Sequence, residues 1–216
     1  MNQILLPMGY ERISLKLRIF WILTAVGYFA FSYLCVQRLA EYLAQGHNFI
    51  PLQLPGEGLI PFIPAFFVAY SATYILPLYL FIQIKSRNDF FKMLGVFLIL
   101  NMVHYLFFIL YPVPYIFRPH FEPANDFLKL LFYFYQLDRP YNNFPSLHVS
   151  FPFLCFYFSR IFVHKQAPIF FLMSILIAFS TLLIKQHYFL DVAAGWFLAW
   201  MTNKLIISRM TFEIQK

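Results

Sequence analysis

Long apolar runs separated by short polar segments dominate the chain. Six of these runs approach or exceed the roughly 20 mostly apolar residues that a helix needs to cross the hydrocarbon core of a bilayer. The pattern predicts spans at 17–36, 59–84, 93–113, 145–163, 167–184 and 189–208. The second run contains Pro61, Pro64 and Pro77, so we expect this helix to be tilted or kinked.

The six predicted spans make the chain one all-α domain, a polytopic membrane bundle over residues 1–216. Two connections between the spans are long enough to carry structure of their own. We expect the first connection, 37–58, to be irregular because Pro51, Pro55 and Gly56 interrupt it.

The second long connection, 114–144, predicts a short helix. Asn125 or Asp126 could cap a helix over 127–137, which is rich in aromatic and aliphatic residues. Such a helix either lies in the lipid interface at the outer face, with Lys129 reaching toward water, or simply packs on the bundle.

The distribution of Lys and Arg predicts the orientation of the bundle. Six spans put both ends of the chain on one side. The side of the N-terminus carries Arg12, Lys16, Arg18, Lys85, Arg87, Lys92, Arg160, Lys165, Lys204, Arg209 and Lys216. The other side carries Arg38, Arg118, Lys129, Arg139 and Lys185. Because basic residues accumulate on the cytoplasmic side, we expect cytoplasmic N- and C-termini, a retained signal anchor and a location in the inner membrane of a bacterium.

Composition excludes an ordinary water-soluble domain. The chain is 61% hydrophobic and only 12% charged, about half the usual charged share. A net charge of +7 would normally suggest nucleic-acid binding. The cations lie in the gaps between apolar runs instead of forming one stripe, so we expect membrane lipids and no nucleic acid as partners. The oligomeric state stays open.

His187 and Asp191 are the first candidates for chemistry. The two residues are four apart, so they share a face if the last helix has begun by then. The carboxylate could then hold the imidazole, fix its tautomer and make His187 a nucleophile. The alternative is a His–Asp pair that satisfies its own hydrogen bonds at a helix end.

Ser146, His148 and Arg118 extend this group of polar residues. Ser146 and His148 open the fourth span, where free backbone N–H groups and the helix dipole favour an anion. Ser146 could also be a simple helix cap, and Arg118 a simple interfacial anchor. Charge counting, however, brings all these residues to the same face as His187, and this convergence favours an anion-processing site.

At these residues the sequence resembles the type 2 phosphatidic acid phosphatase superfamily of integral membrane phosphatases and phosphotransferases. Arg118-Pro119 fits the first motif, and Pro145-Ser146-Leu147-His148 fits the Pro-Ser-Gly-His motif. The third motif is Ser-Arg followed by a His and by an Asp four residues later. Its members here are Ser180, His187 and Asp191, with Thr181 where Arg is expected.

The stretches 141–150 and 180–191 look most similar to the branch that includes inositol phosphorylceramide synthases. In that branch Leu in place of the motif Gly, and Thr in place of the motif Arg, are usual. The resemblance implies a phosphohistidine mechanism without metal or cofactor. His187 would attack phosphorus, Asp191 would orient it, and His148 would protonate the leaving oxygen. Ser146 and Arg118 would bind the phosphoryl oxygens.

The family pattern has two more cations than this chain supplies. Tyr111 stands where the first motif has Lys, and Thr181 where the third has Arg. Lys185 and Arg139 are candidates to replace them, and Ser180, retained from the third motif, is a further candidate phosphate ligand. Lys185 can help only if its turn is irregular, because it lies two residues from His187; otherwise it anchors the interface.

The leading hypothesis is therefore a lipid phosphate phosphatase acting on a monophosphate or diphosphate at the extracytoplasmic face. A lipid phosphotransferase, moving a phosphorylated head group to an alcohol, differs only in its second substrate. A metal site formed by His148, His187 and Asp191 lacks a convincing ligand spacing. The non-enzyme alternative is a membrane carrier or scaffold, whose polar residues would line a path.

Overall fold

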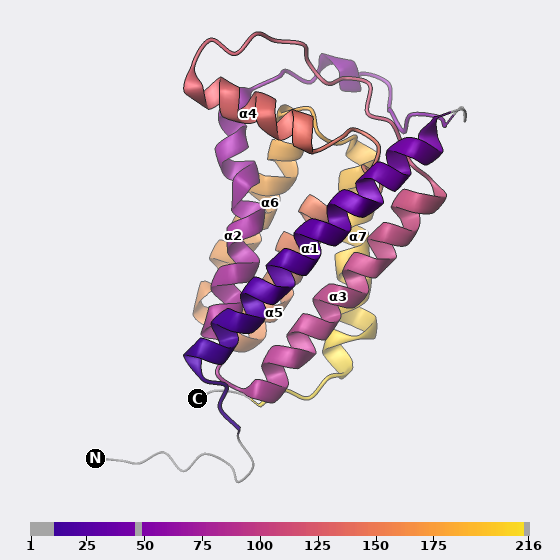
Figure 1. Cartoon of the computed structure of the whole chain (residues 1–216). Coiled ribbons are helices and arrows are strands. Elements are labelled where there is room, and N and C mark those ends of the chain that lie inside the picture. Colours follow the sequence, from indigo (N-terminus) through magenta and orange to yellow (C-terminus); the bar gives the residue numbers. More distant parts are fainter. Residues whose placement is uncertain (1–10, 46–48, 214–216) are drawn as a thin grey trace.

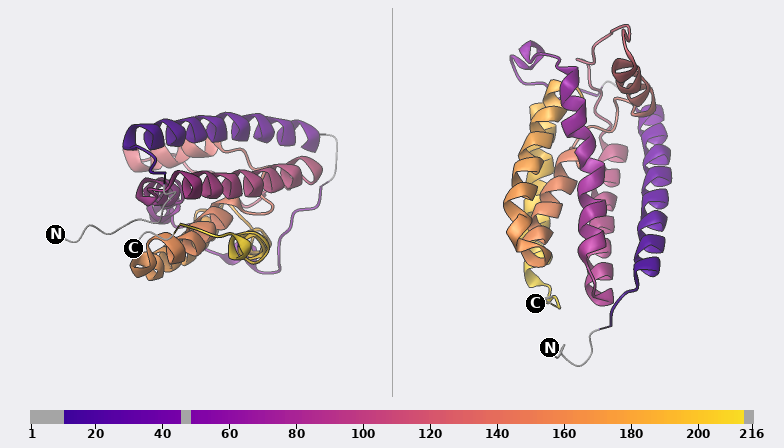
Figure 2. Two further views of the ribbon diagram at one scale, coloured as in Figure 1. Left: turned by 90° about the horizontal axis from the view of Figure 1, so that it is seen from below. Right: turned by 90° about the vertical axis from the view of Figure 1, so that its left-hand side faces the viewer.

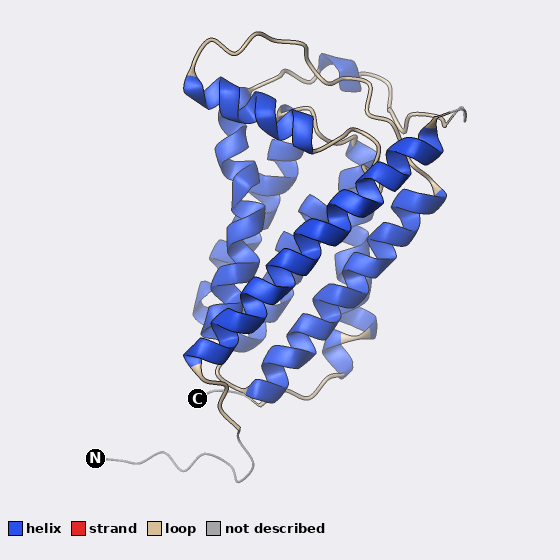
Figure 3. Cartoon of the chain, viewed as in Figure 1, coloured by secondary structure: helices blue, strands red, loops and turns tan. Residues whose placement is uncertain are grey.

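The computed structural model describes residues 11–45 and 49–213. These residues form seven α-helices and no strand, joined by loops and short 3-10 turns (Figure 3). The helices are α1 (Leu15–Ala44), α2 (Phe67–Gln83), α3 (Arg87–Leu110), α4 (Asp126–Leu137), α5 (Leu147–Phe162), α6 (Ala167–Leu183) and α7 (Phe189–Leu205). The prediction of an all-α fold is confirmed.

Each of the six longer helices overlaps one predicted run, and α4 lies at the predicted short helix. The predicted start of the second span at 59 is wrong: α2 begins at Phe67, because Pro61 and Pro64 interrupt the residues before it. Within the described part of the chain, four helical stretches are long and apolar enough to cross a membrane: Leu15–Ala44, Pro64–Gln83, Arg87–Leu110 and His164–Leu183. α5 and α7 have 16 and 17 residues, fewer than a typical crossing helix. Six crossings therefore stay a prediction.

One expected loop is partly helical. Residues 37–44 were expected to be irregular, but α1 continues through them to Ala44. Gln37 and Ala40 are fully buried against the rest of the molecule, and no Pro or Gly interrupts this part of the sequence. Tertiary packing thus extends the helix beyond its apolar run.

α5 is the centre of the bundle. It packs against α2, α3, α6 and α7, whereas α1 lies at the edge and packs against α3 and α2 (Figure 2). α4 lies across one end of the bundle (Figure 1). We call this the α4 end.

The two ends of the described chain lie at the opposite end of the bundle. The amide of Glu213 donates to the Asp89 carboxylate at 3.0 Å, and the amide of Ile13 donates to the Lys85 carbonyl at 3.0 Å. Both ends of the described chain therefore meet the α2–α3 turn at the opposite end.

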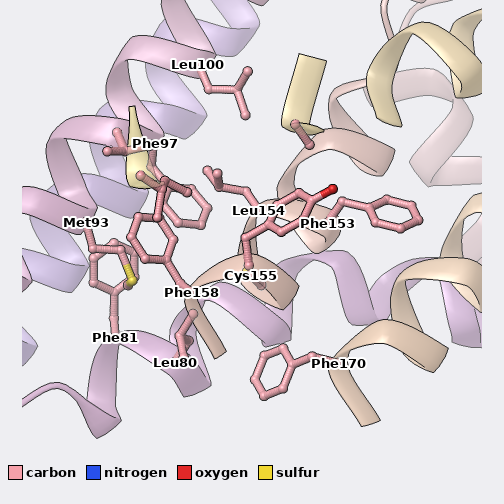
Figure 4. Packing of buried hydrophobic residues seen from close by; sticks show 14 of the residues in the cluster. Leu80, Phe81, Met93, Phe97, Leu100, Phe153, Leu154, Cys155, Phe158 and Phe170 are labelled. Carbon is pink, nitrogen blue, oxygen red and sulfur yellow. The ribbon is translucent and has the colours of Figure 1, made fainter. Parts of the chain in front are cut away.

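The hydrophobic core surrounds α5. It lies between the first turn of α5 and the end of the bundle opposite α4. Its buried side chains come mainly from α2, α3, α5 and α6. Those labelled in Figure 4 are Leu80, Phe81, Met93, Phe97, Leu100, Phe153, Leu154, Cys155, Phe158 and Phe170. Burying this apolar surface fixes α5, and with it the position of the residues at its N-terminus.

α5 and α7 approach each other closely at the α4 end. The Ser146 amide donates to the Asp191 carbonyl at 3.0 Å, and the Ser150 hydroxyl lies 2.9 Å from the Gly195 carbonyl. A Cβ atom at Gly195 would lie 2.4 Å from the Ser146 carbonyl oxygen. Only glycine therefore allows the two backbones to meet as they do.

We predict that Gly195→Ala destabilises the protein by about 1–3 kcal/mol, because the added methyl forces α5 and α7 apart. The matched control is Gly95→Ala on α3, where an added Cβ meets no atom within 4 Å. That variant should be neutral or gain about 0.5–1 kcal/mol, since alanine favours the helix. Thermal unfolding in detergent measures both variants. Equal melting temperatures for the two would contradict the close approach.

Candidate active site

The turn between α6 and α7 carries the candidate nucleophile. The amides of Gln186 and His187 both donate to the Thr181 carbonyl, at 2.9 and 3.3 Å. Lys185 adopts a left-handed conformation, with φ of 53°. This folding reverses the chain within a few residues and leaves His187 just before α7, which begins at Phe189. The sequence predicts that His187 and Asp191 share a helix face if the last helix has begun by His187. In the structure His187 precedes the helix, so the two residues do not share a helix face.

Asp191 nevertheless meets His187, because it lies in the first turn of α7. Its Oδ2 atom accepts a hydrogen bond from the Tyr188 amide at 2.9 Å and lies 3.3 Å from Nδ1 of His187. His187 and Asp191 are almost fully buried, with exposed fractions of 4% and 0%. The helix start therefore fixes the carboxylate, and the carboxylate holds the imidazole.

His148 lies on the other side of the His187 ring. Nδ1 of His148 is 3.3 Å from Nε2 of His187, and Nε2 of His148 is 2.7 Å from the Tyr70 hydroxyl. One assignment of protons satisfies the contacts of this chain of residues: Tyr70 donates to His148, His148 donates to His187, and His187 donates to Asp191. In this assignment Nε2 of His187 carries a lone pair directed at His148.

The N-terminus of α5 offers unpaired donors beside this pair. Ser146 occupies the cap position, but its side chain makes no capping hydrogen bond. Its Oγ atom is buried and has no partner among the described residues. The amides of Leu147 and His148 likewise donate to no described group. A buried hydroxyl and free helix amides together form a site suited to an anion.

Arg118 is tied to the same turn. Its Nη2 atom donates to Oε1 of Gln186 at 2.5 Å, and its Nη1 atom donates to the carbonyls of Tyr135 and Asp138. The guanidinium also stacks 4.7 Å from the centre of the Tyr135 ring. Since Gln186 directly precedes His187, the structure brings the first motif to the third.

The other three predicted phosphate ligands, Arg139, Lys185 and Ser180, have no contact with His148 or His187 among the hydrogen bonds of the described residues. Arg139 and Arg118 line one hollow of about 610 Å³ under α4. Neither His148 nor His187 lines that hollow. The Lys185 ammonium lies 3.4 Å from the Glu57 carbonyl and 5.7 Å from the centre of the Phe117 ring. The Ser180 hydroxyl donates to the Ile177 carbonyl at 2.6 Å. Their roles as phosphate ligands stay predictions.

Burial sets the protonation of groups in this turn. Desolvation lowers the pKa of His187 to about 4; the nearby charge of Asp138 acts to raise it, and that of Arg118 to lower it. His187 is therefore neutral at pH 7, as a nucleophile must be. Burial also lowers the pKa of Lys185, against the attraction of Glu57.

Sequence reasoning missed four residues of the site. Tyr70 and Tyr74, both on α2, place hydroxyls 2.7 and 3.3 Å from Nε2 of His148. Gln186 holds Arg118, and Asp138 supplies the nearby negative charge. The signal for the tyrosines was their spacing of four within an apolar run. Gln186 and Asp138 lie in connections, where no periodicity indicates a partner.

His104 and Asn101 are two further buried polar residues on α3. Nε2 of His104 lies 2.9 Å from the Ser150 hydroxyl, and its Nδ1 atom lies 2.8 Å from the Leu100 carbonyl. His104 thus links α3 to α5. Both amide atoms of Asn101 are buried and unpaired among the described residues.

The geometry also bears on the metal alternative. Within 11–45 and 49–213 no group of three or more His, Cys, Asp or Glu side chains is arranged to hold a metal ion. The His187 ring separates His148 from Asp191, because each of its nitrogens faces a different one of them. These three side chains therefore do not converge on one point.

Comparison with known proteins agrees with the motifs. A family model described as the PAP2 superfamily matches residues 56–205, more than half of the chain. No curated protein and no solved structure gives a significant match. The matched region includes Arg118, His148, His187 and Asp191, the residues whose arrangement is described above. The chain therefore belongs to the PAP2 superfamily.

Proposed function

We propose that this protein is a membrane lipid phosphatase that works through a phosphohistidine at His187. Membership of the superfamily suggests a phosphatase or phosphotransferase activity. One observation supports the finer proposal most strongly. A buried imidazole is held by Asp191 on one nitrogen and faces His148 with the other, beside the unpaired Ser146 hydroxyl.

In the first step Nε2 of His187 attacks phosphorus, and the bond from phosphorus to the lipid oxygen breaks. For this step His148 takes up a second proton when the substrate binds; it then gives the proton on its Nδ1 atom to that oxygen, so the lipid leaves as an alcohol and His148 becomes neutral. Asp191 stabilises the positive charge that develops on His187. The two imidazoles lie 3.3 Å apart, which leaves no room between them for the phosphoryl group. Substrate binding therefore has to separate the two rings.

In the second step His148 removes a proton from water, and the water oxygen attacks phosphorus. The bond from phosphorus to His187 breaks, and inorganic phosphate leaves. The Ser146 hydroxyl, the α5 amides and Arg118 stabilise the equatorial oxygens in both steps. Arg139 and Lys185 are proposed to supply the remaining positive charge in place of the family's missing Lys and Arg.

We further propose six membrane crossings, with the α4 end facing away from the cytoplasm. Ten described Lys and Arg residues lie at the end opposite α4 and five lie toward the α4 end, as the positive-inside rule favours for this orientation. The shorter helix α5 is surrounded by other helices, so its 16 residues need not match the lipid by themselves.

A phosphotransferase is the second candidate, because the site is closed to water. Ser146, His148 and His187 are 0%, 5% and 4% exposed. An alcohol bound in such a site would compete well with water for the phosphorylated intermediate. The resemblance of 141–150 and 180–191 to the branch of inositol phosphorylceramide synthases supports the same candidate.

We predict that His187→Ala lowers phosphate release from lipid phosphates by at least about 1,000-fold, because the nucleophile is lost. The matched control is His164→Ala, which removes an exposed histidine at the opposite end of the bundle. Purified protein would be assayed with phosphatidate, with and without chelator and with a phospholipid donor plus sphingolipid acceptor. Full activity of His187→Ala would end the proposal, and a phosphorylated acceptor would favour the transferase.

The pH profile tests the electrostatics of His187. Only its neutral form attacks, so kcat/KM should fall as pH drops through about 4, the lowered pKa of that group. Arg118→Gln removes a charge that lowers this pKa, so the acid limb should move to higher pH. Asp138→Asn removes a charge that raises it, so the limb should move to lower pH. Shifts in the same direction would contradict this arrangement.

Ser146→Ala should reduce kcat by about 100-fold without destabilising the protein. The loss follows from removing one donor to the transition state. Stability should be unchanged or should rise by up to about 1 kcal/mol, because the buried hydroxyl has no partner. Ser150→Ala is the control: its hydroxyl contacts His104 and Gly195, so its loss should cost about 1–3 kcal/mol. The prediction fails if Ser146→Ala behaves like Ser150→Ala.

A further inference from the structure

A second hollow adjoins the candidate active site on the apolar side of His148. It has a volume of about 180 Å³ and lies between α1, α2, α3 and α5. Leu147 and His148 line one part of it, and Trp21 and Phe90 line another. Along α3 its lining extends from Phe90 to Asn101, a distance of about 16 Å at 1.5 Å per residue.

The lining is almost entirely hydrocarbon and aromatic. The polar residues among it mostly have partners. Thr73 donates to the His148 carbonyl at 3.4 Å, and the Tyr74 hydroxyl lies 3.3 Å from Nε2 of His148. The hollow is therefore suited to a lipid chain whose phosphate lies near His148.

Asn101 is different from these residues. It is 2% exposed, it lines the hollow, and neither its Nδ2 nor its Oδ1 atom has a hydrogen-bond partner among the described residues. Asn101 directs a donor toward the Tyr105 hydroxyl from beyond hydrogen-bond distance, and that hydroxyl makes its 2.8 Å hydrogen bond to Ser32 instead. An unpaired carboxamide in apolar surroundings is costly unless a ligand completes its hydrogen bonds.

We propose that the hollow holds a chain of the lipid substrate and that Asn101 hydrogen-bonds a polar group of the lipid backbone close to the phosphate. This inference rests on the proposed function and names the substrate class. The substrate is a lipid phosphate whose backbone carries an ester, amide or hydroxyl group. A polyprenyl phosphate, with a chain of pure hydrocarbon, lacks the group that Asn101 would bind.

The position of the group follows from the surrounding residues. His148 protonates the leaving oxygen in the proposed mechanism, and it also lines the hollow. A chain attached to that oxygen enters the hollow at His148 and passes Asn101 before it reaches Phe97 and Leu98, one turn of α3 further on. The amide nitrogen of Asn101 can donate to a carbonyl, and its oxygen can accept from a hydroxyl or an amide N–H.

The test compares kcat/KM for four lipid phosphates in mixed micelles: phosphatidate, its dialkyl ether analogue, ceramide phosphate and a polyprenyl phosphate. Wild-type protein should prefer phosphatidate or ceramide phosphate to the ether and polyprenyl compounds. Asn101→Leu should reduce the ratio of kcat/KM for the preferred lipid to that for polyprenyl phosphate by ten-fold or more. The matched control, Asn88→Leu, changes an exposed residue at the other end of α3 and should keep the wild-type ratio.

The outcomes separate the inference from the proposed function. An unchanged ratio in Asn101→Leu, or a wild-type preference for polyprenyl phosphate, would overturn the role of Asn101. The preferred member of the ester and amide pair identifies the backbone. Hydrolysis of none of the four lipids, by wild-type protein that is folded, would count against the phosphatase.

A binding measurement that needs no turnover tests the occupant of the hollow directly. Trp21 lines the hollow, whereas Trp196 and Trp200 lie on α7 and can be replaced by Phe. Phosphatidate with brominated chains should quench Trp21 fluorescence in that double variant. Ala25→Phe fills the hollow from α1 and should abolish this quenching. Equal quenching in both proteins would show that the chain lies elsewhere.

Discussion

The candidate site depends on the contact between the start of α5 and the first turns of α7. The Ser146 amide donates to the Asp191 carbonyl, and the absence of a side chain at Gly195 allows that approach. Each of these helix starts carries part of the site: donors for an anion on α5, and the carboxylate that holds His187 on α7. Because the contact is made by backbone atoms, it fixes the two parts relative to each other more firmly than side-chain contacts alone would.

Burial gives this arrangement its chemical character. His148 and His187 are almost inaccessible to water, and no cation is within ion-pair distance of Asp191 among the described residues. In such surroundings the neutral imidazole is favoured and each remaining charge acts strongly on its neighbours. The Ser146 hydroxyl and the Asn101 carboxamide are buried without a hydrogen-bond partner among the described residues. We propose that the first binds the phosphate and the second the lipid backbone.

The sequence predicted the helices well because apolar runs are a direct signal of helices in a membrane protein. It also predicted that His148, His187 and Asp191 lie together, since each falls in a motif, and the structure places their side chains in contact. It did not predict that α1 continues to Ala44, because that extension depends on tertiary packing. Tyr70, Gln186 and Asp138 were missed for a similar reason: their importance comes from contacts with residues far away in the sequence, which no local pattern records.

The central claim is a covalent bond between phosphorus and Nε2 of His187. Wild-type protein would be mixed with a lipid labelled at phosphorus, quenched within milliseconds to seconds in alkali, and digested for mass spectrometry. The account predicts a phosphoryl group on His187 that survives alkali and is lost in acid, and that accumulates when His148 is replaced by Gln and a lipid with an activated leaving group is used. Label found on another residue, or a chemically competent protein that never becomes labelled, would contradict it.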